Sequence, residues 1–129
     1  MYLAIDYGKK RVGVAVGEKI AFSRGFYNND AELIPSLSKL IREEGVEIVV
    51  FGIPEKDSGL PGELTKEIKL FAGRLQKVEP VRVVFENESD TTSSANQKLK
   101  DAGVDIKSSK GHVDGLAAAE ILEQYINSQ

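Results

Sequence analysis

An unbroken run of β-branched and aromatic residues, Ile48, Val49, Val50 and Phe51, lies near the middle of this 129-residue chain. A strand without alternating polar positions is typical of a parallel sheet whose two faces are both buried. Apolar residues at helical spacing precede and follow this run, and a second β-branched run begins at Val81. This βαβ order predicts an α/β fold in which residues 48–51 form a central strand.

Three short apolar or alternating runs precede this strand, at residues 2–6, 12–16 and about 21–27. Glycine-bearing and charged turns separate them, which is the pattern of consecutive antiparallel strands. Residues 31–44 then carry apolar side chains at helical spacing, and Gly45 stands where a helix-terminating glycine is expected. We therefore expect a three-stranded meander followed by an amphipathic helix.

The second half of the chain alternates loops, helices and strands. Residues 52–62 hold two prolines and three glycines and are predicted to form a loop. After this loop we expect, in order, a helix at 64–75, a strand at 81–85, a helix at 91–102 ended by Gly103 and a last helix at 113–126, and the pattern leaves open an additional short strand near 104–106. These elements predict one domain, residues 1–129, built on a mixed five-stranded sheet. Three antiparallel strands come first and parallel strands follow, with helices on both faces.

The composition narrows the chemistry of any functional site. The chain has no cysteine and one histidine, so a metal ion would be held mainly by oxygen atoms, which favours Mg²⁺ or Mn²⁺. A net charge of -3 disfavours a protein that coats nucleic acid, although basic residues gather at 9–11 and at Lys107 and Lys110. No apolar run approaches the ~20 residues that cross a bilayer, and the N-terminus shows no signal-like core. We expect a cytoplasmic protein without a membrane partner.

Carboxylates lie where the predicted fold would gather ligands, beyond the carboxyl ends of its strands. Asp6 ends the first strand, Glu86 and Glu88 follow the strand at 81–85, and Asp114 opens the last helix. Acids brought together repel one another unless cations lie between them, and a pair of magnesium ions can activate water and stabilise the leaving oxygen of a phosphodiester. The alternative is that each acid is merely solvated, with Asp114 favoured by the helix dipole. Spacing alone leaves both interpretations open.

Five segments carry recognisable motifs. They are residues 6–15 (Asp-Tyr-Gly-Lys-Lys-Arg-Val-Gly-Val-Ala), residues 40–44, residues 48–54, the group Thr91, Thr92 and Ala95, and the group Val113, Asp114, Ala117, Ala118, Ile121, Leu122 and Tyr125. Together they span nearly the whole chain and resemble the YqgF (RuvX-like) family. The resemblance implies an RNase H-like fold.

The same resemblance implies a nuclease that hydrolyses phosphodiester bonds with Mg²⁺ or Mn²⁺ as cofactor. The family is associated with maturation of the 5′ end of precursor 16S rRNA in ribosome biogenesis, and with resolution of Holliday junctions in DNA recombination and repair. Its catalytic, metal-binding acids fall here on Asp6, Glu88 and Asp114. The implied partner is structured RNA or branched DNA, bound by a monomer or a homodimer.

The middle motif departs from the family pattern. Where the family has Asp-Glu-Arg-Leu, this chain has Asn87, Glu88, Ser89 and Asp90. The missing arginine removes a bidentate contact to phosphate. Glu86 lies two residues from Glu88, on the same side of a strand, and is the candidate to replace the lost carboxylate. The departure favours, as an alternative, a weakened family member that binds nucleic acid without cleaving it.

The turn after the first strand is a candidate for contact with substrate phosphates. Gly8 would let a phosphate approach the backbone closely. Lys9, Lys10 and Arg11 would supply positive charge beside Asp6, and Arg11 also matches the family motif. Ordinary solvation of a hairpin is the alternative interpretation of these lysines.

Three residues nearer the C-terminus are further candidates. Lys110 and Thr91 could contact substrate, although Thr91 is also a good helix N-cap residue. His112 could move a proton, but a surface histidine at a helix start is the favoured interpretation. An Asp-x-Gly opening also occurs in actin-like ATPases and sugar kinases, which place two such domains around a nucleotide cleft, so one short domain argues against that class.

Overall fold

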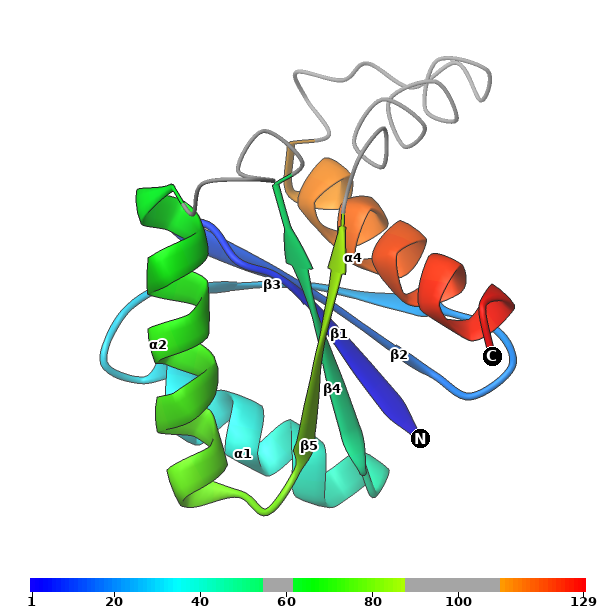
Figure 1. Ribbon diagram of the computed structural model, residues 1–129, viewed down its shortest axis with the longest axis horizontal. Helices are drawn as coiled ribbons and strands as arrows, with labels where there is room; N and C mark the ends of the chain where they lie inside the picture. Colours follow the sequence, from blue (N-terminus) through cyan, green and yellow to red (C-terminus); the bar gives the residue numbers. More distant parts are fainter. Residues whose placement is uncertain (55–61, 88–109) are drawn as a thin grey trace.

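The computed structural model describes residues 1–54, 62–87 and 110–129. Within these ranges the elements are, in chain order, β1 (Tyr2–Asp6), β2 (Arg11–Gly17), β3 (Phe22–Asn28), α1 (Leu33–Glu44), β4 (Ile48–Ile53), α2 (Glu63–Val78), β5 (Arg82–Asn87) and α4 (Lys110–Asn127). The five strands form one sheet in the order β3-β2-β1-β4-β5. Figure 1 shows α1 and α2 on one face of this sheet and α4 on the other.

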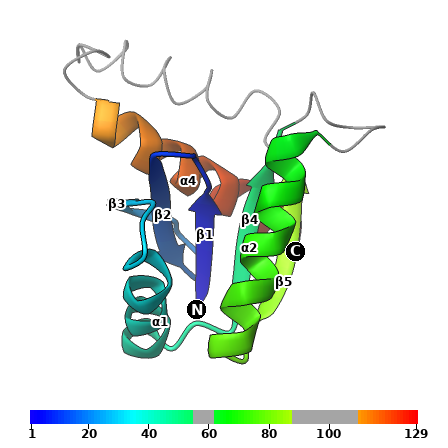
Figure 2. The same ribbon diagram turned by 90° about the vertical axis from the view of Figure 1, so that its left-hand side faces the viewer.

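The sheet changes from antiparallel to parallel at its central strand. β1 pairs with β2, and β2 with β3, in antiparallel fashion, as expected for a meander. On its other side β1 pairs with β4, and β4 with β5, in parallel. The mixed five-stranded sheet with helices on both faces is therefore confirmed. The carboxyl ends of β1, β4 and β5 meet at one edge, here called the carboxyl edge (Figure 2).

Alternating side chains of the buried strands divide the core into two layers. On the face covered by α1 and α2, Ile5 and Phe51 pack with Phe71 and Leu75 of α2. On the other face, small residues of β1 and β2 lie under α4. The residues of this second layer are Ala4, Ala15, Val50, Ala118, Ile121, Leu122 and Tyr125, all buried. Alanine at the contact lets a helix lie close to a sheet, so α4 is held against β1 and β2.

Two predicted element boundaries on the α1 and β4 side are wrong by two residues. The first helix begins at Leu33 and not at Ala31, because Asp30 forms a turn in front of it. The Asp30 side chain accepts a hydrogen bond from the backbone N–H of Glu32 at 3.0 Å, and its backbone oxygen accepts one from Leu33. The predicted loop at 52–62 begins too early, because β4 continues to Ile53.

Two element boundaries in the second half of the chain also differ from the prediction. β5 extends past the predicted end at Phe85 to Asn87, because Glu86 and Asn87 pair in register with β4. The last helix begins at Lys110, three residues earlier than expected. The predicted helix at 91–102 and strand at 104–106 lie outside the described residues. No helix in the described part of the chain is long and apolar enough to cross a membrane.

A buried carboxylate joins α1 to the end of α2. Glu79, only 5% exposed, caps α2 and accepts a hydrogen bond from the Ser38 hydroxyl. The same oxygen, Oε1, accepts a second bond from Nε of Arg42 at 2.7 Å. The bond from Ser38, helped by the guanidinium of Arg42, holds the pKa of Glu79 below its ordinary value of 4.5 although burial opposes this. The charged form of Glu79 is therefore favoured by folding.

This linkage predicts a stability that depends on pH. A carboxyl group whose pKa is lowered by folding stabilises the protein above its unfolded value and loses that effect as the pH falls through the folded value. We expect Glu79→Gln to lower the free energy of unfolding at about pH 7, and the difference from wild type to shrink below about pH 4. Denaturant unfolding at both pH values measures this. The exposed Glu43→Gln is the matched control on α1, and a gap for Glu79→Gln that stays constant with pH would contradict the assignment.

Candidate active site at the carboxyl edge

Asp6 and Glu86 lie in one row across the sheet. Asp6 is the last residue of β1 and stands opposite Gly13 of β2. On the parallel side Ile5 pairs with Phe51, so the same register continued by one residue sets Gly52 of β4 level with Asp6, and Glu86 of β5 pairs with Gly52. Residues in register point to the same face of a sheet, and this row points to the face that α4 covers. The two acids are thus two strands, or roughly 10 Å, apart on one face.

The neighbours of Asp6 in this row are both glycines. Gly13 and Gly52 carry no side chain, so the adjacent strands place nothing beside the Asp6 carboxylate on the α4 face. Asp6 itself is half-buried. A glycine within a strand often marks a place where a ligand or another backbone comes close. Neither adjacent strand therefore places a side chain beside Asp6 in this row.

Glu86 is held toward α4. Its Oε2 accepts a hydrogen bond from Nε2 of Gln124 at 3.0 Å, and the same amide nitrogen donates to the backbone oxygen of Asn87 at 3.0 Å. Gln124 was not predicted as a site residue, because its partner lies far away in the sequence. The substitution of Glu86 for the lost carboxylate stays a prediction. Glu88, two residues further along, lies outside the described residues.

The helix that carries Asp114 covers the same face. Because α4 begins at Lys110, Asp114 is the fifth residue of the helix and does not open it, which corrects the predicted position. Lys110 and His112 lie in the first turn. In both ribbon views this turn lies at the end of the sheet to which the carboxyl ends of β4 and β5 point (Figures 1 and 2). Among the side chains that the structure describes, no three acids or histidines are grouped closely enough to hold a metal ion.

The turn from β1 to β2 is fixed by Asn29. The Asn29 side chain donates a hydrogen bond to the backbone oxygen of Gly8 at 2.8 Å, and its backbone N–H donates to that of Lys10 at 2.9 Å. Lys9 and Lys10 are exposed beside the carboxyl edge. The two hydrogen bonds from Asn29 therefore order the turn, which presents the ammonium groups of Lys9 and Lys10 to solvent. The sequence analysis did not identify Asn29, because it follows β3 and lies 21 residues from Gly8 in the chain.

A cation and an aromatic ring lie together at the β3 end of the row. The guanidinium of Arg11 stands 5.3 Å from the ring centre of Phe26, a cation–π distance. Phe26 pairs with Gly13 and so belongs to the same row as Asp6, yet it is 41% exposed. Bases stack on exposed aromatic and guanidinium groups of this kind. Phe26 is a candidate contact that the sequence analysis did not include.

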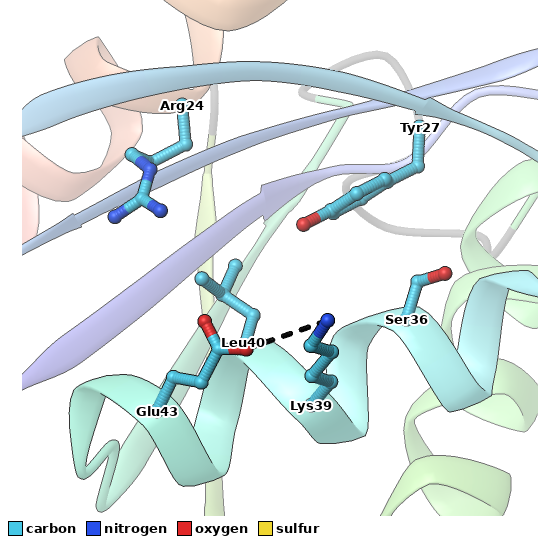
Figure 3. A pocket seen from close by; sticks show the side chains of 6 residues that line it. All are labelled: Arg24, Tyr27, Ser36, Lys39, Leu40 and Glu43. Carbon is cyan, nitrogen blue, oxygen red and sulfur yellow. Dashed lines mark ion pairs between the residues drawn. The ribbon is translucent and has the colours of Figure 1, made fainter.

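A pocket of about 250 Å³ between β3 and α1 lies apart from this row, on the face opposite α4 (Figure 3). Its two cations are already neutralised. Arg24 bonds Glu44 at 2.8 Å, which raises the pKa of Arg24, and Lys39 pairs with Glu43 at 3.7 Å. Paired cations attract a phosphate weakly, so this pocket adds nothing to the candidate site.

Comparison of the fold places the chain in a structural class. A structure titled T. thermophilus RuvC in complex with Holliday junction substrate has a TM-score of 0.59 at 14% identity, covering 99% of this chain and 96% of that one. The fowlpox virus Holliday junction resolvase has a TM-score of 0.60 at 13% identity, covering 99% of each chain. The chain thus has the RNase H-like fold of the resolvases.

Sequence comparison identifies the family. Residues 1–128 match the RuvX family, described as Holliday junction resolvase, and the chain belongs to that family. A protein of Nitrosospira multiformis is 33% identical, covering 98% of this chain and 87% of its own length. One of Shewanella denitrificans is 34% identical, covering 98% and 94%. Both carry the name "Putative pre-16S rRNA nuclease". The resemblance found in the motifs, and the nuclease class it implies, are confirmed.

The packing of the β1–β2 turn predicts a sensitivity at Gly8. A Cβ atom there would lie 2.5 Å from the backbone oxygen of Arg11, so the turn would have to shift. We expect Gly8→Ala to cost about 1–3 kcal/mol of stability, as overpacking commonly does. Gly73→Ala is the control, because no atom lies within 4 Å of the added Cβ and alanine favours a helix by roughly 0.5–1 kcal/mol. Thermal unfolding of both variants tests this, and a neutral Gly8→Ala would show that the turn is loosely packed.

Proposed function

We propose that this chain hydrolyses phosphodiester bonds in structured RNA, as a nuclease that matures the 5′ end of precursor 16S rRNA. The observation that carries the proposal is the row that sets Asp6 between two glycines on the face covered by α4. Glu88 and Asp114 are the other proposed catalytic acids. The names of the relatives that match nearly the whole chain support the substrate. A substrate of this kind belongs in the cytoplasm.

The residues near Asp6 fit a divalent cation with oxygen ligands. The row offers carboxylates without cysteine or histidine, a donor set that suits Mg²⁺ or Mn²⁺. Asp6, Glu88 and Asp114 would hold the ions, and Glu86 could contribute from the same face of the sheet. The bound ions would activate water and stabilise the charge of the leaving oxygen.

The basic residues around the row would position the substrate strand. Lys9 and Lys10, exposed on the ordered turn, would contact phosphates as point charges, and Gly8 would let the strand approach the backbone. Arg11 stacked on Phe26 would contact phosphate or base. Lys110 and Thr91 are also proposed to contact the strand. These contacts orient the strand over Asp6.

Cleavage of Holliday junctions is the second candidate, and the description of the family favours it. A junction needs two cuts placed symmetrically, hence two copies of the chain related by a twofold axis. Cleavage of a four-way DNA junction together with a dimeric mass in solution would support this function over RNA maturation. Binding of either substrate without cleavage would instead support the weakened member implied by Ser89.

The proposal predicts that the acids are essential while the fold is not affected. Asp6→Asn should reduce cleavage of a precursor 16S rRNA fragment in Mg²⁺ by more than the roughly 10- to 100-fold that loss of an outer-shell partner costs. Glu88→Gln and Asp114→Asn should behave alike, and chelator should abolish cleavage by wild type. The exposed Glu47→Gln, at the opposite edge of the sheet, is the control. Full activity of Asp6→Asn would overturn the assignment.

A further inference from the structure

A hollow of about 480 Å³ opens on the α2 side of the carboxyl edge. It is lined by Tyr7 from the end of β1 and by Glu67, Leu70 and Arg74 from α2. Tyr7 directly follows Asp6 in the chain but packs on the opposite face, with the core under α2. The hollow therefore lies on the opposite side of the carboxyl edge from the candidate acids. Its residue Tyr7 is adjacent in sequence to Asp6. Its volume is in the range of sites that bind small planar molecules, roughly 300–1,000 Å³.

One stripe of α2 supplies three walls of the hollow. Glu67, Leu70 and Arg74 are three and four residues apart, so they lie along the same side of the helix. Leu70 is 71% exposed, the largest exposure among the large apolar side chains of the described residues. The neighbouring stripe is buried and contains Ile68 and Phe71. An apolar side chain is thus presented to solvent between an acid and a base.

The buried ring of Phe71 contacts two of the residues that line the hollow, Tyr7 and Arg74. Phe71, only 2% exposed, lies 5.2 Å from the ring of Tyr7 and 5.6 Å from the guanidinium carbon of Arg74, measured to its own ring centre. Neither Glu67 nor Arg74 forms an ion pair within the described part of the chain. Their hydrogen-bonding groups therefore remain available to a ligand, while Phe71 fixes Tyr7 and Arg74.

The chemistry of the hollow matches a nucleobase better than a phosphate. A phosphate would gain no net attraction here, because the charges of Glu67 and Arg74 sum to zero. A base has apolar faces, which Leu70 and Tyr7 can contact, and an edge that both donates and accepts hydrogen bonds. The carboxylate of Glu67 accepts from amino groups of a base, and Arg74 donates to its carbonyl and ring nitrogen atoms.

We propose that this hollow receives an unpaired base of the substrate strand, next to the phosphate that lies at Asp6. The inference rests on the proposed nuclease function, since it takes Asp6 as the position of the phosphate. The two faces of the carboxyl edge then have different tasks. The α4 face holds the reacting phosphate, and the α2 face selects strands with an unpaired nucleotide beside it.

Binding of RNA with single missing bases tests the inference separately from cleavage. The probes are fluorescein-labelled fragments spanning the 5′ end of 16S rRNA, each with one abasic nucleotide near the cut. Their affinity is measured by anisotropy in Ca²⁺, and cleavage of the same fragments is measured in Mg²⁺. We expect one abasic position to weaken binding to wild type on the order of tenfold, as loss of a stacked base does.

Variants on the exposed stripe of α2 supply the comparison. Leu70→Ser and Arg74→Gln should bind the intact fragment more weakly and lose most of the tenfold dependence on that one base. Lys77→Ala, an exposed cation of the same helix outside the hollow, should behave like wild type. Sensitivity to the same abasic position in Leu70→Ser as in wild type would overturn the inference, as would a scan in which no position matters.

The two proposals fail in different ways. Base-dependent binding through Leu70 without any cleavage in Mg²⁺ would support the inference and contradict the proposed nuclease function. Cleavage by wild type at a rate that no abasic position changes would support the nuclease function and contradict the inference. No binding of RNA at all would remove both.

Discussion

The parallel register of β1, β4 and β5 determines where Asp6 and Glu86 lie relative to each other. A slip of one residue would turn Asp6 away from α4 and toward the core under α2, because alternate residues of a strand face opposite sides. The register is held from both faces. Ala4 and Val50 pack under α4, while Ile5 and Phe51 pack under α2. The position of Asp6 is thus a consequence of the core packing of the residues just before it in β1 and of their partners in β4.

The two faces of the carboxyl edge are built differently, which suits different tasks. On the α4 face the neighbours of Asp6 in the row are glycines, and Gln124 fixes Glu86 from the helix. On the α2 face Tyr7 and Leu70 form walls of a hollow that the buried layer keeps in place. A strand laid over this edge would meet the candidate acids on one side, and on the other a hollow whose apolar walls lie between an acid and a base. At the end of β1 the two faces are represented by consecutive residues, since Asp6 points to the α4 face and Tyr7 packs on the α2 face.

Much of this arrangement follows from local sequence pattern, and the rest does not. The β-branched run of β4 and the helical spacing in α1 predicted the sheet, and Asp6 was placed correctly because it ends an apolar run. Glu86 was placed just beyond the end of the strand, since the apolar pattern stops at Phe85 and gives no sign that polar residues continue the strand. Its pairing with Gly52 is a contact between two strands, and its bond to Gln124 is a contact between a strand and a helix. Such contacts depend on the folded chain and not on spacing.

The most direct test of the site is to locate a divalent ion in solution. Mn²⁺ added to ¹⁵N-labelled protein broadens the amide signals nearest to it. If the carboxyl edge holds the ion, Asp6, Gly13, Gly52 and Glu86 should broaden first, and Asp6→Asn should require far more Mn²⁺ for the same effect. Broadening that spreads over exposed acids elsewhere, unchanged in Asp6→Asn, would contradict a metal site at this edge.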